Sequence, residues 1–363
     1  MGGMSNSKQD FERIREAVES ADQALASALN ARAQAVQELS ELRARAPDAY
    51  YTLPRDNDVI TRVTERTPNL PKDAARAVMR EVLSACTKLI APIEVVYAGQ
   101  EGGFGHQAAR THFGASAVLR AVDTAETLVA ELERKQAAFG LLPFETSYDG
   151  AVTQTLNLLA RSDVKICAEV PITRAFHLVS KSGQRSDVRK IYAAPSALSA
   201  CEKYLSRSFP EAVLIDTRSH MVAAERATLE ADAAALGTDV GAEIAGLSVI
   251  EKSVEDVADL DTRYVAVGND YPPRTGRDRT AVAVALHDAP GVLIDCLRPF
   301  ADRRINLYRL ETRPARGWEF RYLVLLEVDG HITDRTVLAS VEELRTAGRY
   351  VKVLGSYPRV KDN

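Results

Sequence analysis

Arginines continue the apolar stripe of the first long segment of the chain. Apolar residues recur at a three-four spacing from Phe11 to Ala28, and the same spacing runs on through Arg32 to Arg43. A buried guanidinium without a partner is costly, so these arginines need carboxylates from the protein or from a ligand. A planar, bidentate donor suits a ligand with two carboxylates. Ion pairs between subunits are the alternative, and the acidic residues available for them are Glu19, Glu38 and Glu41.

A glycine-rich loop, Gly99–Ala108, separates a β-branched run from a helical pattern. Free backbone amides and the helix dipole favour an anion at such a place, so the loop is a candidate carboxylate or phosphate site. Gly103, Gly105 and Ala108 also fit the spacing G-x-G-x-x-A, with Asp123 after a later strand, which leaves a nicotinamide dinucleotide site as an alternative. In a third interpretation the glycines only permit the turn.

Three further segments carry groups that could move a proton or hold a ligand. His106, at the start of the predicted helix, is a candidate acid or base, or else a solvated side chain. Pro143–Ser147 places a carboxylate and two hydroxyls after a strand, where α/β proteins gather ligands. Thr262-Arg263-Tyr264 similarly ends a polar loop before a strand. None of these segments identifies a reaction by itself.

The elements that position these residues belong to three segments, each with its own sequence pattern. Phe11 to Arg45 contains no glycine or proline and predicts one helix of roughly 50 Å, long enough to pack along a partner chain, so we expect a homodimer or a higher homo-oligomer. A second helix is predicted from about Pro54, and a third over Asp73 to Leu89. Strand-like runs then alternate with helical stretches from Ile93, which predicts a mostly parallel, helix-covered sheet.

The stretch from Gly268 to Thr280 reads as a linker, and a small domain of the split βαβ kind follows it. Its predicted strands cover 280–286, 306–312, 320–328 and 350–355, and its predicted helices cover 292–300 and 333–346. The fold class is therefore multidomain α and α/β. We expect a helical domain at 8–92, a two-lobed α/β domain at 93–270 and a C-terminal α+β domain at 279–360.

Composition narrows the partners and the location. The fractions of 46% hydrophobic and 26% charged residues are typical of a soluble globular protein, and a net charge of -4 gives no basic field for nucleic acid or anionic lipid. The four cysteines lie far apart without metal-type spacing, which favours reduced thiols and no metal site. Because the chain shows neither a membrane-length apolar run nor a signal-peptide core, we expect a cytoplasmic protein.

Taken in order, these pieces resemble the bifunctional chorismate mutase/prephenate dehydratase family across about Phe11 to Arg359. The C-terminal part resembles a phenylalanine-binding ACT regulatory domain. There Pro290-Gly291-Val292-Leu293 resembles P-G-A-L, Ile305-Asn306-Leu307 resembles I-N-L, and Glu311-Thr312-Arg313-Pro314 resembles E-S-R-P. The resemblance implies that these residues bind phenylalanine as an effector, namely Gly291, Val292, Leu293, Asn306, Leu307, Glu311, Thr312, Arg313 and Pro314.

The central part resembles the dehydratase domain. Gly99 to Ala109 resembles G-P-E-G-T-F-S-H-Q-A-A, Pro143 to Ser147 resembles P-I-E-N-S, and Thr262-Arg263-Tyr264 resembles T-R-F. The resemblance implies that Thr262 donates to the leaving hydroxyl or positions it, that Glu145 supports the hydroxyl side, and that Arg263 orients carboxylates. It also implies further substrate-binding groups in this domain, namely the amides of Gly102 and Gly103, and Thr146, Ser147 and Ser219.

The N-terminal part resembles the helical chorismate mutase domain. The resemblance implies that Arg15, Arg32 and Arg55 contact the carboxylates of chorismate, with Asp56 also at a binding position. Arg43 stands where the family has lysine and would contact the ether oxygen and a carboxylate. Near Cys86, Ile90 stands where the family has Gln or Glu. This reaction is a rearrangement that needs no nucleophile, metal or cofactor, only a compact substrate and stabilised charge.

Several positions depart from the family pattern where the substrate is expected. Gly103 stands for Thr, Gly105 for Ser, Thr146 for Asn, Ser196 for Gln and Leu260 for Asn, while Ser219-His220-Met221 replaces S-T-A. Lost donors change which groups a site stabilises. Two rivals to the bifunctional enzyme follow: a relative that acts on a modified prephenate or decarboxylates it without dehydration, and a catalytically impaired phenylalanine-binding regulator. A dinucleotide enzyme is the third.

Overall fold

The structure is a computed structural model that describes residues 3–45, 56–90, 93–147, 150–257, 261–314, 322–346 and 350–360. The chain forms two compact units. The first comprises Met1–Ile93 with Phe113–Val118, and the second comprises Glu94–His112 with Leu119–Asn363. In the described residues, no helix has both the length and the apolar character needed to cross a membrane.

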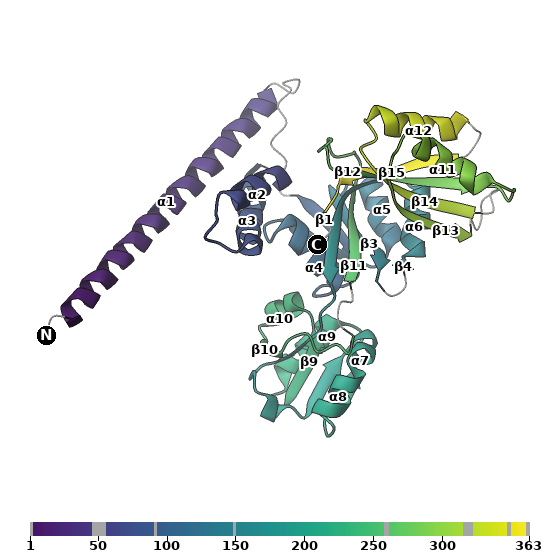
Figure 1. Ribbon diagram of the computed structural model, residues 1–363. Coiled ribbons are helices and arrows are strands. Elements are labelled where there is room, and N and C mark those ends of the chain that lie inside the picture. The colour runs from purple at the N-terminus through teal and green to yellow at the C-terminus, as the bar shows by residue number, and fades with distance from the viewer. Residues whose placement is uncertain are drawn as a thin grey trace. The chain divides into compact units, whose positions relative to one another are not determined.

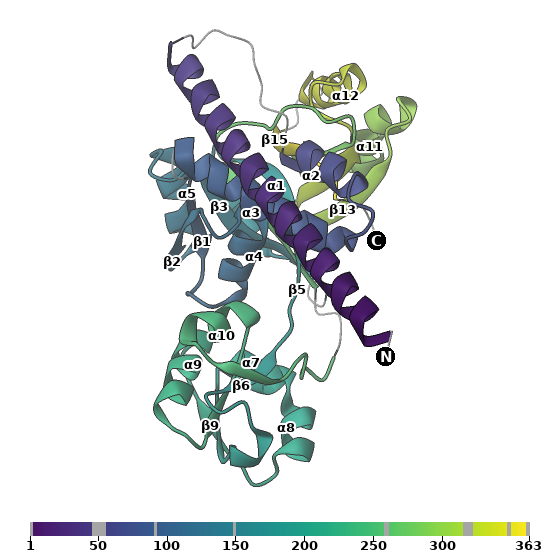
Figure 2. The same cartoon turned by 90° about the vertical axis from the view of Figure 1, so that its left-hand side faces the viewer.

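The first unit is helical, and its longest element is α1 (Gly3–Arg45). Helices α2 (Asp56–Glu65) and α3 (Lys72–Ile90) pair with each other, and α3 also lies against α1 (Figures 1 and 2). The predicted long helix is confirmed, and it begins earlier than the periodicity indicated. Its apolar stripe stays open to solvent in a single chain, since Phe11 is 79% exposed and Leu25 is 57% exposed.

The second unit begins with a lobe built on a mixed sheet, in which β1 is parallel to β3 while β11 runs antiparallel between β3 and β5. Its strands are β1 (Glu94–Ala98), β2 (Val118–Val122), β3 (Phe139–Thr146), β4 (Gly150–Ala151), β5 (Lys165–Thr173) and β11 (Asp261–Gly268). Its helices are α4 (Phe104–Phe113), α5 (Ala125–Glu133) and α6 (Thr153–Arg161).

A second lobe is inserted between β5 and β11 and has a five-stranded sheet of its own (Figure 2). Its strands are β6 (His177–Ser180), β7 (Lys190–Ala193), β8 (Val213–Asp216), β9 (Ala233–Gly237) and β10 (Ser248–Glu251). Its helices are α7 (Pro195–Ala200), α8 (Glu202–Ser208), α9 (His220–Leu229) and α10 (Asp239–Ala245).

The prediction of one mostly parallel sheet is therefore wrong. The chain leaves the first lobe through β5 and returns through β11, so β11 must run against its neighbours, and the strands between them form a separate sheet. In that sheet β7 is parallel to β8 and β9, but β6 is antiparallel to β9 and β10. A run of apolar residues does not reveal which sheet a strand joins.

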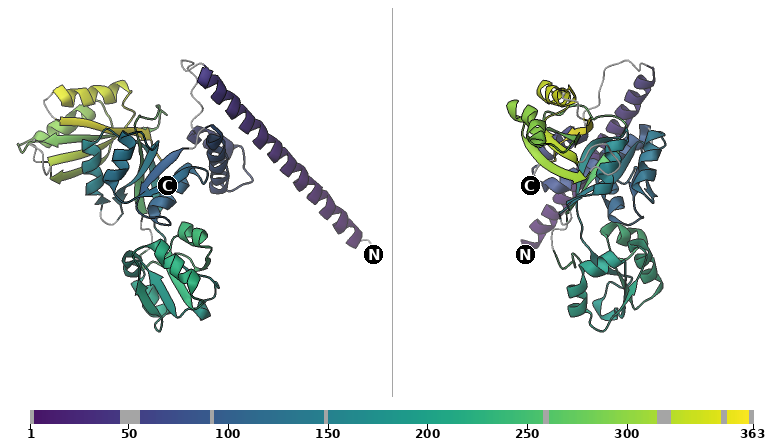
Figure 3. Two further views of the ribbon diagram at one scale, coloured as in Figure 1. Left: turned by 180° about the vertical axis from the view of Figure 1, so that it is seen from behind. Right: turned by 90° about the vertical axis from the view of Figure 1, so that its right-hand side faces the viewer.

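The C-terminal part has the predicted α+β pattern, with an antiparallel sheet in the order β13-β14-β12-β15. Its elements are β12 (Asp278–Leu286), α11 (Val292–Asp302), β13 (Leu307–Pro314), β14 (Tyr322–Asp329), α12 (Arg335–Thr346) and β15 (Tyr350–Pro358). Helices α11 and α12 cover one face, and the opposite face packs against α6 (Figure 3).

Strand β15 joins the C-terminal sheet to the sheet of the first lobe. Gly355 pairs in parallel with Ile166 of β5, which makes one continuous ten-stranded sheet. A Cβ atom at Gly355 would collide with the backbone oxygen of Ile166, so only glycine allows this approach. The C-terminal part and the first lobe therefore share both a sheet and a hydrophobic core.

Candidate active site

A cleft of about 410 Å³ opens in the second unit, where the first and second lobes face each other. The first lobe contributes the loop between β1 and α4 and the facing residues of β3 and β11. The second lobe contributes the segments that precede α7 and α9, and Arg174 comes from the connection between β5 and β6. Thr238 of the second lobe donates to the carbonyl oxygen of Gly102 at 2.5 Å, which ties the two lobes together beside the cleft.

Strand β11 carries the predicted motif and presents alternate residues to the cleft. Thr262 and Tyr264 line it, whereas Arg263 lies between them and points to the opposite face of the sheet. Thr262 is 3% exposed, and its Oγ1 has no hydrogen-bond partner among the described residues. An unpartnered buried hydroxyl is costly unless a ligand uses it, so Thr262 is the strongest single indication of a substrate group here.

A bulge in β3 decides which residues of the segment Pro143–Ser147 reach the cleft. Tyr264 pairs with Pro143 while Arg263 pairs with Glu145, so one residue of β3 is skipped. Pro143 and Thr146 consequently both line the cleft, and Glu145 turns away from it. The predicted direct contacts of Glu145 and Arg263 with substrate are therefore wrong for this structure. Both side chains instead join an ion-pair cluster on the far face of the sheet.

The backbone amides of Gly102 and Gly103 already donate hydrogen bonds within the protein. The Gly102 N–H donates to Nδ1 of His106 at 3.1 Å, and the Gly103 N–H donates to the carbonyl oxygen of Gln100 at 3.1 Å. The prediction that these two amides cradle a carboxylate is therefore wrong, because neither points an open donor into the cleft. Gly103 itself does line the cleft.

His106 is a structural residue of that loop. Its ring stacks on Tyr97 with 5.1 Å between centroids. Burial lowers the pKa of His106, while Glu101 raises it by less and Arg110 adds a small lowering. A solvated side chain was one of the two predictions for His106, and the stacking and burial contradict it. Since its Nδ1 accepts from Gly102, its role in this structure is to shape the turn.

Two guanidinium groups in the cleft belong to no motif that the sequence suggested. Arg174 lies over the ring of Phe104 at 5.0 Å, and its Nε has no hydrogen-bond partner among the described residues. Arg218 lines the same cleft from the exposed segment before α9. Together they make the cleft positively charged, which suits a ligand that carries a carboxylate.

The start of α9 places a histidine in the cleft. Ser219 caps the helix, because its hydroxyl accepts from the Val222 N–H at 3.1 Å, so its side chain serves the helix first. His220 follows, packed beside Phe104 and Phe176, and its Nδ1 has no partner among the described residues. Burial, and then the nearby Arg174, lower the pKa of His220, which keeps its ring neutral near pH 7.

The predicted substrate residues of the first unit are only partly described. Arg15 is exposed and pairs with Glu19 of the same helix at 3.2 Å. Arg32 is half-buried, and its Nη1 has no hydrogen-bond partner among the residues that the structure describes. Arg55 lies outside the described residues, as do the side chains of Arg43 and Asp56.

The predicted effector residues lie at both ends of the C-terminal sheet. Gly291 caps α11 with a φ of 81°, and Val292 and Leu293 begin that helix. Asn306 immediately precedes β13, at the other end of the sheet. Its side-chain amide donates to Asp329 at 3.1 Å. One chain therefore does not bring all nine residues together.

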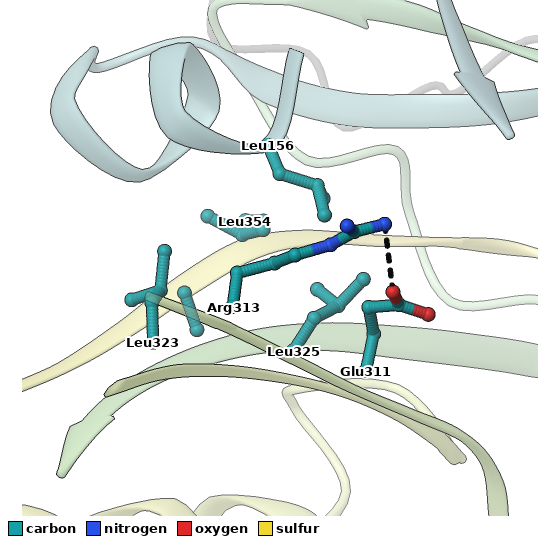
Figure 4. Close-up of a pocket in the computed structure, with 7 residues that line it drawn as sticks. Leu156, Glu311, Arg313, Leu323, Leu325 and Leu354 are labelled. Atoms are coloured by element: carbon teal, nitrogen blue, oxygen red, sulfur yellow. Dashed lines mark ion pairs between the residues drawn. The ribbon is translucent and has the colours of Figure 1, made fainter. Parts of the chain in front are cut away.

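Between the two ends, the side chain of Arg313 faces the central domain. It pairs with Glu311 at 2.9 Å, donates to the backbone of Ala151 at 3.1 Å and lies in a small apolar pocket below Leu156 (Figure 4). Thr312 is exposed next to them, and Pro314 ends the strand. Glu311 and Arg313 thus contact the first lobe and do not form an open ligand site in one chain.

Known proteins match nearly the whole length of this chain. The family described as prephenate dehydratase matches residues 95–272, and the family described as chorismate mutase type II matches residues 14–90. A bifunctional chorismate mutase/prephenate dehydratase from Neisseria gonorrhoeae is 31% identical over 349 residues, which cover 95% of this chain and 96% of the relative. This chain belongs to the bifunctional chorismate mutase/prephenate dehydratase family.

Other members of the family agree. A bifunctional chorismate mutase/prephenate dehydratase from Stutzerimonas stutzeri is 30% identical over 363 residues and is covered over 99% of its length. The crystal structure of a prephenate dehydratase from Arthrobacter aurescens, in complex with L-Phe, is 30% identical and superposes with a TM-score of 0.64, covering 73% of this chain and 90% of that one. The chain is therefore an enzyme of this kind.

Most of the residues that depart from the family pattern line the cleft of this mutase/dehydratase family member. Gly103, Gly105, Thr146, Ser196 and His220 all line it, whereas Leu260 lies outside the described residues. The fold of the site is thus that of the family while its polar lining is its own. Of the residues that sequence reasoning missed, His220 was visible as a departure, but Arg174 gave no signal beyond a lone arginine between two apolar runs.

Proposed function

We propose that the second unit converts prephenate to phenylpyruvate in this cleft. The buried Thr262 hydroxyl carries the proposal, because it has no partner among the described residues and lines the same cleft as the two guanidinium groups. In the reaction the ring carboxylate leaves as carbon dioxide, the electrons of that bond enter the ring, and the ring hydroxyl takes up one proton from solvent and leaves as water. Thr262 donates its hydrogen bond to the departing oxygen. Thr146, on the neighbouring strand, is placed to bind the same side of the substrate.

The two carboxylates of prephenate require different environments in the cleft. The side-chain carboxylate keeps its charge and binds a guanidinium, for which Arg174 is the candidate because it is partly buried against Phe104. The ring carboxylate loses its charge when carbon dioxide departs. A strong ion pair would therefore slow decarboxylation, whereas the apolar wall of the cleft favours it. The cleft lining therefore favours a dianion bound by one end.

Replacing Arg174 with glutamine is expected to raise the KM for prephenate about 10-fold or more, with a smaller change in kcat, because a charged contact made equally in ground and transition states is lost. The exposed Arg189, in the same lobe but outside the cleft, provides the control Arg189→Gln. Steady-state kinetics of both variants check this. An unchanged KM in Arg174→Gln would remove Arg174 from carboxylate binding.

The environment of His220 predicts a pH effect on stability. Because burial lowers its folded-state pKa, the unfolded chain binds more protons below the ordinary value of 6.5, and stability falls as the pH drops through that window. The Tm of the wild type should therefore fall further between about pH 7.5 and pH 5.5 than the Tm of His220→Asn. The exposed His287 gives the control His287→Asn. Equal pH slopes in all three proteins would contradict the neutral, buried ring.

For the first unit we infer that it converts chorismate to prephenate, with Arg32 holding a carboxylate, and that two copies of the chain pair along α1. The exposed apolar side chains of α1 and the unpartnered Nη1 of Arg32 support this. The C-terminal domain, which we take to be an ACT domain, is inferred to bind phenylalanine as an effector. The likeness to the dehydratase of Arthrobacter aurescens, whose structure contains L-Phe, supports that inference.

Product analysis with prephenate tests the proposed dehydration. Phenylpyruvate is aromatic and absorbs strongly in alkali, whereas decarboxylation that keeps the ring hydroxyl gives a non-aromatic product with one oxygen more. The altered lining of the cleft favours this second outcome as the alternative. A regulator without catalytic activity would bind phenylalanine and leave prephenate unchanged.

A further inference from the structure

Seven residues, four of them buried and three partly buried, form a connected polar cluster on the face of the sheet that lies opposite the cleft. Four strands of the C-terminal domain and three strands of the first lobe contribute to it. The members of this buried charge cluster are Glu145, Glu169, Arg263, Arg279, Arg309, Glu327 and Tyr357. None of them lines the cleft.

Arg263 is the centre of the buried charge cluster and uses every nitrogen of its guanidinium. Its Nη1 and Nη2 donate to the two carboxylate oxygens of Glu327 at 2.9 and 2.8 Å, so this pair is bidentate. Nη1 also donates to Glu169 at 3.0 Å, and Nε donates to Glu145 at 3.0 Å. The guanidinium lies over the ring of Phe144 at 4.8 Å. Such a set of contacts fixes both the position and the plane of the group.

The remaining members complete the balance of charge. Arg279 pairs with Glu169 at 2.6 Å, Arg309 pairs with Glu145, and the Tyr357 hydroxyl donates to Glu327 at 2.7 Å. Three guanidinium groups thus face three carboxylates, and the cluster is neutral. Glu327 is 0% exposed and Arg279 is 1% exposed. Removing one member of a buried ion pair leaves the other uncompensated, so the cluster tolerates few arrangements.

Both central charges persist across the neutral pH range. Burial alone would lower the pKa of Arg263, but Glu327, together with Tyr357 and Glu169, more than offsets it and the pKa is raised. Burial would likewise raise the pKa of Glu327, yet Arg263 and Tyr357 hold it below its ordinary value. The pair therefore remains a salt bridge near neutral pH.

Two of the three first-lobe members of the cluster are chain neighbours of residues that line the cleft. Arg263 is the chain neighbour of Thr262, and Glu145 is the chain neighbour of Thr146. Because side chains alternate across a strand, a shift of the Arg263 side chain along the sheet moves the Thr262 hydroxyl on the other face. The cluster residues and the cleft hydroxyls therefore share the backbones of β3 and β11.

The same cluster continues toward the predicted effector residues. Arg309 lies 3.5 Å from Glu311, and Glu311 pairs with Arg313 at 2.9 Å (Figure 4). Ion pairs therefore connect Arg313 to Arg263 without a break, through Glu311, Arg309 and Glu145. A change in the position of β13 has a direct electrostatic route to β11.

We infer that Arg263 is a positioning residue of the dehydratase: held by the buried charge cluster, it places the Thr262 hydroxyl in the cleft and makes that placement depend on the C-terminal domain. This inference rests on the proposed dehydration and adds its regulation. It accounts for an arginine that follows a catalytic threonine in the chain yet touches no part of the cleft.

The test compares Glu327→Gln and Tyr357→Phe with wild type, using Glu343→Gln as the control. Glu343 pairs with Arg303 at 2.8 Å between the outer helices, apart from the cluster. For Glu327→Gln we expect kcat for prephenate to fall about 10-fold or more, KM to stay within about twofold, and inhibition by phenylalanine to weaken while its binding persists. Tyr357→Phe should change the same quantities in the same direction by less, and Glu343→Gln should change none.

Hydrogen exchange of the peptide that spans residues 261–268 provides a readout that needs no turnover. It should become faster in Glu327→Gln and Tyr357→Phe and stay unchanged in Glu343→Gln. If Glu327→Gln does not fold, Tyr357→Phe carries the test, because it removes a single hydrogen bond.

The outcomes separate this inference from the proposed function. Normal kcat, normal exchange and full response to phenylalanine in the folded cluster variants would overturn the inference. Absence of dehydration in the wild type would instead overturn the proposed function, and the exchange of residues 261–268 would still decide whether the cluster holds β11.

Discussion

Thr262→Val is expected to lower kcat for phenylpyruvate formation by about 10²–10³-fold, the usual loss when a group that stabilises charge in the transition state is removed. Valine has nearly the same shape, so the cleft stays intact. Since the Thr262 hydroxyl has no partner among the described residues, its removal should leave the Tm unchanged or raise it. Activity and stability are thus predicted to move independently.

The control for this variant is Thr173→Val. Thr173 lies on the adjacent strand β5, and its hydroxyl donates to Asp261 at 2.7 Å outside the cleft. We expect nearly normal dehydration and a modest loss of stability, about 1 kcal/mol, because an exposed hydrogen bond is removed. Phenylpyruvate formation at the wild-type rate in Thr262→Val would contradict the role of this hydroxyl.

Arg32→Ala is expected to lower the conversion of chorismate to prephenate by about 10²–10³-fold, because alignment of the two reacting arms depends on held carboxylates. Dehydration of added prephenate should stay normal, since Arg32 belongs to the other compact unit. Consumption of chorismate and of prephenate, measured separately on the same preparation, checks both statements.

The same helix offers a matched control in Arg13→Ala. The Arg13 side chain is 76% exposed and only approaches Asp10, at 3.6 Å. Removing it tests for a general effect of lost positive charge on α1. A wild-type mutase rate in Arg32→Ala, or an equal loss in Arg13→Ala, would show that Arg32 is not a specific carboxylate contact.

Much of the fold could be predicted from the sequence because its elements are locally specified. The absence of glycine and proline between Phe11 and Arg45 was sufficient to predict α1. The C-terminal strands and helices were predicted from apolar periodicity. Sheet membership could not be predicted in the same way. The insertion of the second lobe between β5 and β11 is a long-range property, and it reversed the direction expected for β11.

The candidate site shows the same division between local and long-range information. The alternation of side chains along β11 separates Thr262 from Arg263, and it could have been applied to the sequence. The bulge that turns Glu145 away from the cleft, and the use of the Gly102 amide by His106, depend on tertiary contacts. Arg174 reaches the cleft only because the chain crosses between the lobes there, and no spacing rule predicts that.

The central claim, one chain with two consecutive activities, is tested most directly by giving the purified full-length protein chorismate as its only substrate. Products are then identified by mass and by absorbance in alkali. The account predicts transient prephenate, followed by phenylpyruvate and carbon dioxide in equal amounts. Accumulation of a decarboxylated product that keeps its ring hydroxyl, or of prephenate alone, would contradict it.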